Sequence, residues 1–347
     1  MKRRVVITGL GLLTPLGQGV EPCWSGLLAG RSTATLIERF DTEGFATRFA
    51  CQLSGFEPRD FIDGRLVRPS DPFVHYGLAA AHLALDDAGL EAPDDEPIAE
   101  RWGVYVGSGL GGVGSFEQNC RALAARGPRR VSPYFVPSTI ANLAAGQIAI
   151  RYRLLGPNMA HVSACASGAH AIGEAYHALQ RDEADVMLAG ASEAAVTPMG
   201  LAGFGAMKAL STRNDDPAAA SRPFDKDRDG FVLGEGAGVL VLEDLEHAKR
   251  RDARIYAEVL GFGANADAHH ITQPSPDGAG AARCMSLALR SAALDTAAVD
   301  HVNAHGTSTR FNDIAETASI KRALGARAQE IPITANKSVI GHLLGAG

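Results

Sequence analysis

A cysteine, two histidines and a lysine form a set of residues that could perform covalent chemistry together. Cys165 lies in HVSACASGAHAIGEA, His305 lies in NAHGTSTRFNDIAET, and Lys337 and His342 lie in NKSVIGHLLGAG. A cysteine thiolate is a good nucleophile, and neutral imidazoles can donate hydrogen bonds to a developing oxyanion. The combination therefore suits acyl transfer through a thioester. The alternative for each residue alone is an ordinary structural role, since free cysteines are usually buried and inert.

The local sequence predicts that these residues lie where strands end. A short strand over Met159–Ala164 precedes Cys165, and small residues then lead into a helix that reaches about Leu179. The thiol is expected at a helix N-terminus, where the helix dipole would lower its pKa. Sites of α/β folds gather at such junctions. Asp313 and Glu316 follow His305 by eight and eleven residues and are candidates to hold the Lys337 ammonium.

The wider pattern alternates strands and helices and contains a faint internal repeat. Buried strands are expected at Arg4–Thr8, Trp102–Val106, Val186–Ala189 and Gly238–Glu243, and a helix at Pro72–Ala88. A strand that enters a Gly-rich bend occurs at Gly103–Gly112 and again at His301–Thr309. A strand that enters a small-residue helix occurs at His161–Gly173 and again at Ile333–Gly347. We therefore predict an α/β fold of two related halves, residues 1–250 and residues 251–347, the second of them incomplete.

Composition excludes several classes of function. The chain has 347 residues, of which 46% are hydrophobic and 21% are charged, and its net charge of −6 offers no footprint for nucleic acid. Five cysteines without a CxxC pair favour a reducing compartment over a disulfide scaffold or a zinc ribbon. Two uncharged 20-residue runs, 131–150 and 154–173, are broken by Pro, Gly and Asn, which indicates core segments instead of membrane spans. We predict a cytoplasmic protein.

Three motifs resemble ligand sites but lack a required residue. Gly109, Gly111 and Gly114 fit GxGxxG, yet no acid follows about 20 residues on to bind a ribose. The segment 225–230 (DKDRDG) opens like a calcium loop, but a glycine stands where the twelfth position needs a glutamate, so a tight turn is favoured. His301 and His305 stand four residues apart without the glutamate of HExxH. No metal or nucleotide cofactor is predicted.

Taken together, the motifs resemble the β-ketoacyl-acyl-carrier-protein synthases of the elongating type, within the thiolase-like superfamily. The resemblance rests on VVITGLGLLTPLG, PCWSGLLAGRS, DPFVHYGLAAA, the Cys165 motif, LSTRNDDPAAASRPFDKDRDGFVLGEGAG, AHGTST and NKSVIGH, and it covers essentially all of the chain. It implies an α/β fold of thiolase-like, duplicated α/β/α/β/α layers with mixed five-stranded sheets. The family's C-terminal segment, with a Gly-Phe-rich loop near the cysteine, has no counterpart after Gly347. We therefore expect a truncated chain of doubtful activity.

The resemblance implies an acyltransferase that works in two steps. Cys165 would take an acyl chain from acyl carrier protein as a thioester. Malonyl-carrier protein would then lose CO2, and its carbanion would attack that thioester in a Claisen condensation. His305 and His342 would donate hydrogen bonds to the malonyl thioester oxygen, with Lys337 in support. The substrates would be bound as thioesters to the phosphopantetheine arm of the carrier, and no other cofactor is implied.

The resemblance also implies substrate contacts. Thr307 and Thr309 correspond to residues that contact the pantetheine arm. Leu110 and Phe204 match positions that line or gate the acyl pocket, and Phe135 matches a residue of a dimer interface. For these last three residues, ordinary core packing is the alternative.

The implied partners are acyl carrier protein and a second ketosynthase-like subunit. Because the carrier is strongly acidic, a basic patch is expected near the mouth of the pocket. The candidates are Arg65, Arg68, Arg129, Arg130 and Lys208. The second subunit would be another copy of this chain or a chain-length factor.

Departures from the family pattern leave the pathway open. Arg310 stands where fatty-acid synthases usually carry proline, and here the chain resembles ketosynthase subunits of type II polyketide systems. The segment HVSACASGAHA is more similar to fatty-acid elongation enzymes. A degradative thiolase would need a second reactive cysteine in a comparable motif. The alternative of a different class is a non-catalytic subunit that only dimerises, in which Cys165 would be unreactive.

Overall fold

The computed structural model describes residues 2–347, and its main element is a mixed seven-stranded sheet. The strands run in the order β2-β1-β8-β7-β5-β6, and β9 also pairs with β1. Their bounds are β1 (Val5–Thr14), β2 (Gly17–Gln18), β5 (Trp102–Gly107), β6 (Asn158–Met159), β7 (Val186–Glu193), β8 (Gly236–Asp244) and β9 (Ala257–Val259). β6, β5 and β7 are parallel, whereas β8 is antiparallel to both β7 and β1.

Glycines in β1 let a helix lie directly on the sheet. The long helix α3 (Pro72–Ala88) has the predicted bounds, starts at the Asp71 cap and ends at Gly89 in the left-handed conformation. A Cβ atom on Gly9 would lie 2.3 Å from the carbonyl oxygen of Ala84, and one on Gly11 would lie 1.8 Å from that of Ala80. Any side chain at these two positions would push α3 away from the strand.

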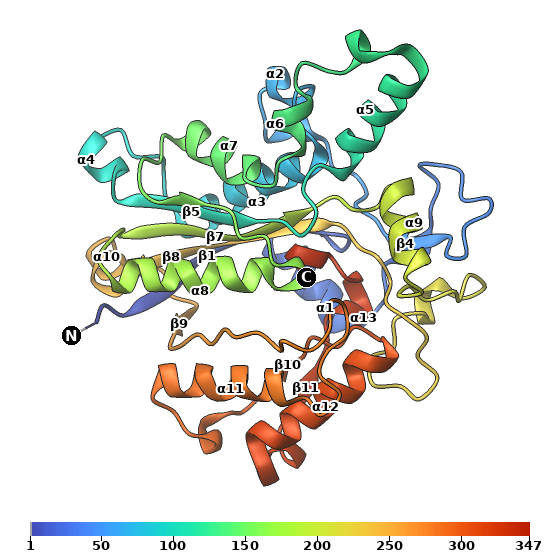
Figure 1. Cartoon of the computed structure of the whole chain (residues 1–347). Coiled ribbons are helices and arrows are strands. Elements are labelled where there is room, and N and C mark those ends of the chain that lie inside the picture. The colour runs from blue at the N-terminus through green and yellow to red at the C-terminus, as the bar shows by residue number, and fades with distance from the viewer. Residues whose placement is uncertain (1) are drawn as a thin grey trace.

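Helices cover both faces of the main sheet (Figure 1). On one face, α3 and α7 (Leu143–Tyr152) bury apolar side chains such as Phe73 and Ile148 against the strands. On the other face, α8 (Ser167–Gln180) packs Ala171, Ala175 and Leu179 against the sheet. The apolar strands predicted from the sequence therefore form the centre of the core, because they are covered on both sides.

The second half lies beyond α8 (Figure 1). It contains a parallel pair of strands, β10 (Val302–Asn303) and β11 (Ile333–Thr334), and the helices α11 (Ala279–Ala292) and α12 (Arg310–Leu324). The layers follow the expected α/β/α/β/α order. The strand counts differ from the expected five: the main sheet has gained β2 and β9, and the second sheet has two strands. One reason is that β9, from residues 257–259, pairs with β1 of the first half.

Most of the remaining elements are short, except the 14-residue helix α5. They are α1 (Val20–Ala29), β3 (Ala34–Leu36), β4 (Phe49–Cys51), α2 (Gly64–Val67), α4 (Glu96–Ala99), α5 (Val113–Arg126), α6 (Phe135–Thr139), α9 (Pro198–Ala206), α10 (Leu245–Arg250) and α13 (Lys337–Ile340), with 3-10 turns that include η2 (Pro128–Arg130), η3 (Ala164–Ala166) and η7 (Leu344–Ala346). Among residues 2–347, none of the helices has both the length and the hydropathy needed to cross a membrane.

Candidate active site

Cys165 lies in the 3-10 turn η3, directly before α8. The strand predicted to precede it is shorter than expected, because pairing with β5 ends at Met159 and the chain then turns toward α8. Ala164 has a φ of 51°, a left-handed conformation that is unfavourable for a residue with a Cβ atom. The turn is held by Ser167, whose Oγ donates to the Ala164 carbonyl oxygen at 2.7 Å. The small-residue helix that follows is the predicted one.

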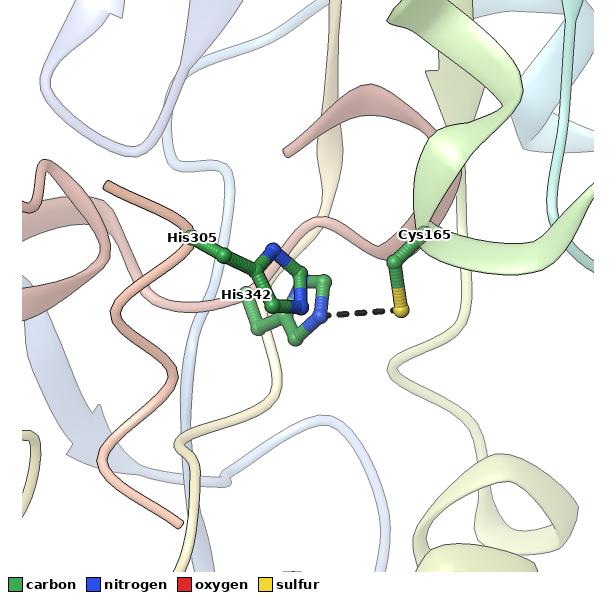
Figure 2. Close-up of side chains that lie close together, drawn as sticks. All are labelled: Cys165, His305 and His342. Atoms are coloured by element: carbon green, nitrogen blue, oxygen red, sulfur yellow. Dashed lines mark hydrogen bonds between the residues drawn. The ribbon is translucent and has the colours of Figure 1, made fainter. Parts of the chain in front are cut away.

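His342 lies against the thiol. Its Nε2 atom is 3.1 Å from the Sγ of Cys165, as Figure 2 shows. Its Nδ1 atom accepts the backbone N–H of Leu344 at 3.0 Å. Because Nδ1 accepts a hydrogen bond, the proton of the neutral ring is on Nε2. His342 therefore presents an N–H donor toward the sulfur.

His305 completes the group. Its ring centroid lies 5.5 Å from that of His342, with the planes at 86° (Figure 2). Donor atoms of Cys165, His305 and His342 all lie within 4.8 Å of one another. The backbone around His305 is fixed by Glu316, whose carboxylate accepts the N–H of His305 at 2.6 Å and that of Gly306 at 2.8 Å. Residues distant in sequence thus meet at one point.

The electrostatics keep both imidazoles neutral. Burial, assisted by Lys337, lowers the pKa of His305 to about 3. Burial also lowers the pKa of His342 well below its ordinary value, with His305 and Lys337 adding to the effect. Neutral rings at physiological pH are the form expected of hydrogen-bond donors to an oxyanion.

The pKa of the Cys165 thiol is shifted in the opposite direction to our prediction. Burial raises it, and Glu193 raises it further, while Lys337 and a backbone hydrogen bond lower it. The predicted decrease is wrong because loss of solvent outweighs these favourable neighbours. Lys337 itself is 8% exposed, and burial lowers the pKa of its ammonium against the opposing charges of Cys165 and Glu316.

The two acids expected to hold Lys337 have other hydrogen-bond partners. Asp313 accepts the N–H of Phe224 at 2.7 Å and pairs with Arg228 at 3.3 Å. The prediction that Asp313 holds the ammonium is therefore wrong. Glu316 lies close enough to Lys337 to raise the pKa of the ammonium, but its hydrogen bonds go to the backbone of His305 and Gly306.

Arg228 is a residue that the sequence analysis missed. It lies in the DKDRDG segment and donates to the carbonyl oxygens of Thr309 and Arg310 at 3.0 and 2.8 Å. Together with the ion pair between Arg228 and Asp313, these hydrogen bonds connect the DKDRDG loop of the first half to the first turn of α12. One sequence signal could have pointed to Arg228. The DKDRDG segment is a highly charged turn that does not match a calcium loop, so its charges needed another role.

The candidate pantetheine contacts lie just before α12. The Oγ1 atoms of Thr307 and Thr309 are 2.9 Å apart. Between them, Ser308 has a φ of 68° and is held from the first half: its Oγ accepts the N–H of Arg222, and its carbonyl oxygen accepts the N–H of Gly230. The position of both threonines therefore depends on the 222–230 loop.

A cavity of about 1060 Å³ opens beside the site. Cys165, His305 and Lys337 line it, whereas Leu110, Phe204, Thr307 and Thr309 do not.

The candidate acyl-pocket residues reach the site indirectly. Phe204 packs on Phe231 with ring centroids 5.4 Å apart, and Phe231 packs on His342 at 5.2 Å. Leu110 follows β5, and its side chain is 45% exposed. Phe135, the candidate interface residue, begins α6 and lies against Phe116 of α5.

The five basic docking candidates are all exposed, and none of them lines the cavity. Arg65 and Arg68 belong to α2 and its C-terminal cap, Arg129 and Arg130 end η2, and Lys208 follows α9. Arg65 is paired locally with Asp63 at 2.8 Å. The other four candidates leave their charges available at the surface for an acidic partner.

The Cys165 sulfur and the ring nitrogens of His305 and His342 are also atoms that could coordinate a zinc ion. The charge of Lys337 acts on all three of them and opposes a divalent cation at this point. The arrangement is better suited to a covalent intermediate on sulfur with two N–H donors beside it.

A layered α/β fold with a cysteine at the start of a buried helix and two neutral histidines beside it defines a thiolase-like ketosynthase. The chain belongs to the beta-ketoacyl synthase family: residues 2–248 match its N-terminal domain, and residues 256–347 match its C-terminal domain.

Named relatives agree with this assignment. The 3-oxoacyl-acyl-carrier-protein synthase 2 of Vibrio cholerae is 53% identical over 99% of this chain and 83% of its own length. That of Coxiella burnetii is 48% identical over the same shares. The expectation of a truncated chain of doubtful activity is not borne out by these alignments, which extend along 99% of the chain and 83% of the Vibrio cholerae relative.

Solved structures share the fold. A type II polyketide synthase acyl-carrier protein in complex with its ketosynthase bound to the hexaketide is similar with a TM-score of 0.91 and 35% identity, over 100% of this chain and 83% of that one. The ishigamide ketosynthase/chain length factor has a TM-score of 0.91 and 38% identity over the same shares. A beta-ketoacyl synthase from Burkholderia phymatum has a TM-score of 0.90 and 39% identity, also over 100% and 83%.

Proposed function

We propose that this protein is a β-ketoacyl-acyl-carrier-protein synthase that extends fatty acyl chains. The observation that carries the proposal is the 3.1 Å approach of His342 Nε2 to Cys165 Sγ, with a second neutral histidine at the same point. The names of relatives that are 46–53% identical support the choice of substrate class.

In the first half-reaction, the Cys165 sulfur attacks the carbonyl carbon of an acyl-carrier thioester. A carbon–sulfur bond to Cys165 forms, the bond to the pantetheine sulfur breaks, and the thiol proton leaves with the carrier. Because burial raises the thiol pKa, the resting group is protonated. The start of α8 and Lys337 stabilise the negative charge that develops on the sulfur during the attack.

In the second half-reaction, the malonyl carboxylate leaves as CO2 and its electron pair becomes an enolate. His305 and His342 donate hydrogen bonds to the thioester oxygen that gains the charge. Each such donor is typically worth about 3 kcal/mol of barrier. The carbanion then attacks the acyl carbon on Cys165, a carbon–carbon bond forms, and the Cys165 thiolate departs. The two half-reactions need no cofactor beyond the phosphopantetheine arm of the carrier protein.

A second candidate is the ketosynthase subunit of a type II polyketide synthase, paired with a chain-length factor. Arg310, exposed at the first position of α12, is the observation that favours it. One similar solved structure is a type II polyketide synthase complex, at 35% identity, and another is a ketosynthase/chain length factor, at 38% identity. We place it second because the fatty-acid relatives are more similar to this chain.

We further propose acyl carrier protein and a second copy of this chain as partners. The exposed basic residues of α2 and η2 are suited to an acidic carrier. Exposed apolar side chains on α5 and α6, including Phe116 at 48% and Val136 at 60%, are suited to a subunit interface. The five free cysteines fit a reducing compartment such as the cytoplasm.

Intact-mass spectrometry after exposure to an acyl-carrier thioester tests the proposal, with Cys165→Ala as the control. We expect one acyl adduct on the wild-type protein and none on the variant, and we expect malonyl-carrier protein to discharge the adduct as a β-ketoacyl product. A folded protein that forms no adduct contradicts the proposal and favours a non-catalytic subunit.

A further inference from the structure

Glu193, the last residue of β7, holds a buried carboxylate that the proposed reaction does not use. The residue is 0% exposed, and its two oxygens accept four hydrogen bonds from uncharged donors. Oε1 accepts Ser108 Oγ at 2.9 Å and Leu110 N–H at 3.1 Å. Oε2 accepts Gly109 N–H at 2.6 Å and Gly345 N–H at 3.1 Å. A carboxylate buried without a cation is costly, so a role that needs all four donors is indicated.

These bonds join the loop after β5 to the turn η7, and Gly345 of that turn lies 152 residues after Glu193 in the chain. The loop after β5 is bound through Oε1 and Oε2, and the turn η7 is bound through Oε2 alone. The packing there is backbone against backbone, since a Cβ atom on Gly345 would lie 2.5 Å from the Gly109 nitrogen. One on Gly168, in the first turn of α8, would lie 2.8 Å from the Gly345 carbonyl oxygen. The carboxylate therefore fixes the separation of the two loops.

The turn that Glu193 holds also sets the state of His342. Gly345 donates to Glu193, and the residue before it, Leu344, donates to His342 Nδ1 at 3.0 Å. Leu344 has a φ of 47°, a conformation that needs support from its surroundings. If the turn were released, Nδ1 would lose its donor, and nothing would then hold the ring proton on Nε2.

We propose that Glu193 is a positioning residue that keeps His342 in the Nε2–H tautomer facing Cys165. Through Leu110, the same carboxylate also anchors the loop expected to border the acyl chain. The consequence for rate rests on the proposed function, whereas the consequence for the tautomer does not.

The substitution Glu193→Gln tests this directly. A carboxamide keeps the shape but offers one acceptor oxygen instead of two, so at least one backbone N–H loses its partner. We expect the Nδ1–H tautomer of His342 to become populated, as detected by 15N NMR with His342→Asn as the assignment control. We expect kcat for condensation to fall roughly tenfold to a hundredfold, the loss typical of a charge-assisted hydrogen bond. The KM for malonyl-carrier protein should stay within about twofold of the wild-type value. The substitution does not remove contacts that bind the substrate equally in the ground state and the transition state.

Two further variants separate positioning from general loss of stability. Glu243→Gln removes another fully buried carboxylate, one that binds His247 and Arg251 at the far end of the neighbouring strand. It should lower stability and leave the tautomer as in the wild type. Ser108→Ala removes one donor from Oε1 and spares the bond to Gly345, so it should also keep the wild-type tautomer.

An unchanged His342 tautomer in Glu193→Gln overturns the inference, as does an equal change in Glu243→Gln. If Glu193→Gln does not fold, Glu193→Asp, which draws the oxygens back by one methylene, is measured with the same expectations. A wild-type protein that fails to condense substrates refutes the proposed function, while the NMR measurement still decides the role of Glu193.

Discussion

The Nε2 atom of His342 lies 3.1 Å from the Sγ of Cys165, although 177 residues separate them in the chain. The contact joins the 3-10 turn η3 to the segment after α13. The ring proton of His342 lies on Nε2, because Nδ1 already accepts a backbone N–H. One N–H group therefore lies beside both the nucleophile and the volume in which a malonyl oxyanion would form.

His305→Ala should lower the rate of malonyl-carrier decarboxylation by roughly a hundredfold to a thousandfold, because one oxyanion donor is lost. Release of CO2 from malonyl-carrier protein measures this step. Acylation of Cys165, followed by intact mass, should remain within a few-fold of wild type. An equal loss in both steps would contradict the assignment of His305 to the enolate.

The pH profile of Cys165 alkylation should respond in opposite directions to two nearby charges. Lys337 lowers the thiol pKa and Glu193 raises it. Lys337→Met should therefore move the profile to higher pH, and Glu193→Gln should move it to lower pH. Iodoacetamide kinetics, with Cys165→Ala as the blank, measure both shifts. Shifts of the same sign would show that the pKa does not follow these charges.

The unfolding free energy should decrease in acid partly because of His305. Its pKa is about 3 in the folded protein and 6.5 as a model value, so the unfolded chain binds the proton first. This contribution is present in full above pH 6.5 and is lost as the pH falls toward 3, at up to about 1.4 kcal/mol per pH unit. Urea titrations at several pH values should show a shallower dependence for His305→Asn. An unchanged slope would argue against the assignment.

Arg228→Gln should destabilise the protein by about 3–5 kcal/mol, because Asp313 is then left buried without a cation. Among folded molecules, the KM for malonyl-carrier protein should rise, since Arg228 holds the backbone beside Thr309. Arg228→Gln combined with Asp313→Asn should be less destabilised than the sum of the two single variants. Additive losses in urea unfolding would show that the pair does not act as a unit.

Arg129→Glu together with Arg130→Glu should raise the KM for an acyl-carrier substrate and leave that for an acyl-CoA surrogate unchanged. Both residues are exposed at the end of η2, where a reversed charge would repel an acidic carrier. Steady-state kinetics with the two substrates give the comparison. Equal effects on both would refute docking at η2.

The sequence was sufficient to predict the residues that meet at the site. Cys165 follows β6 of the main sheet, whereas His305 follows β10, and Lys337 and His342 follow β11 of the two-stranded sheet. All four lie beyond the carboxyl ends of strands, where α/β folds place their sites. The helix over Pro72–Ala88 was also predictable, because Asp71 and Gly89 mark its start and end.

The supporting contacts were not predictable, because they depend on partners far away in the chain. Glu193 ends an apolar strand, and nothing near it indicates that Gly345 will be its partner. Asp313 was assigned to Lys337 from proximity in sequence to His305, whereas its partner Arg228 lies in the other half. The predicted direction of the Cys165 pKa shift was wrong for a related reason. Burial raises this pKa, and the burial of a side chain depends on the whole fold.

The long separation between Cys165 and His342 also affects the protein while it is being made. At about 5–20 residues per second, the ribosome needs roughly 9–35 s to extend the chain from Cys165 to His342, 177 positions later. Throughout that interval the cysteine exists without His342, as an ordinary thiol on a nascent chain. Reactivity toward thioesters is therefore acquired late in biosynthesis, and an oxidant or electrophile that reaches the thiol in that interval would inactivate the enzyme before its first turnover.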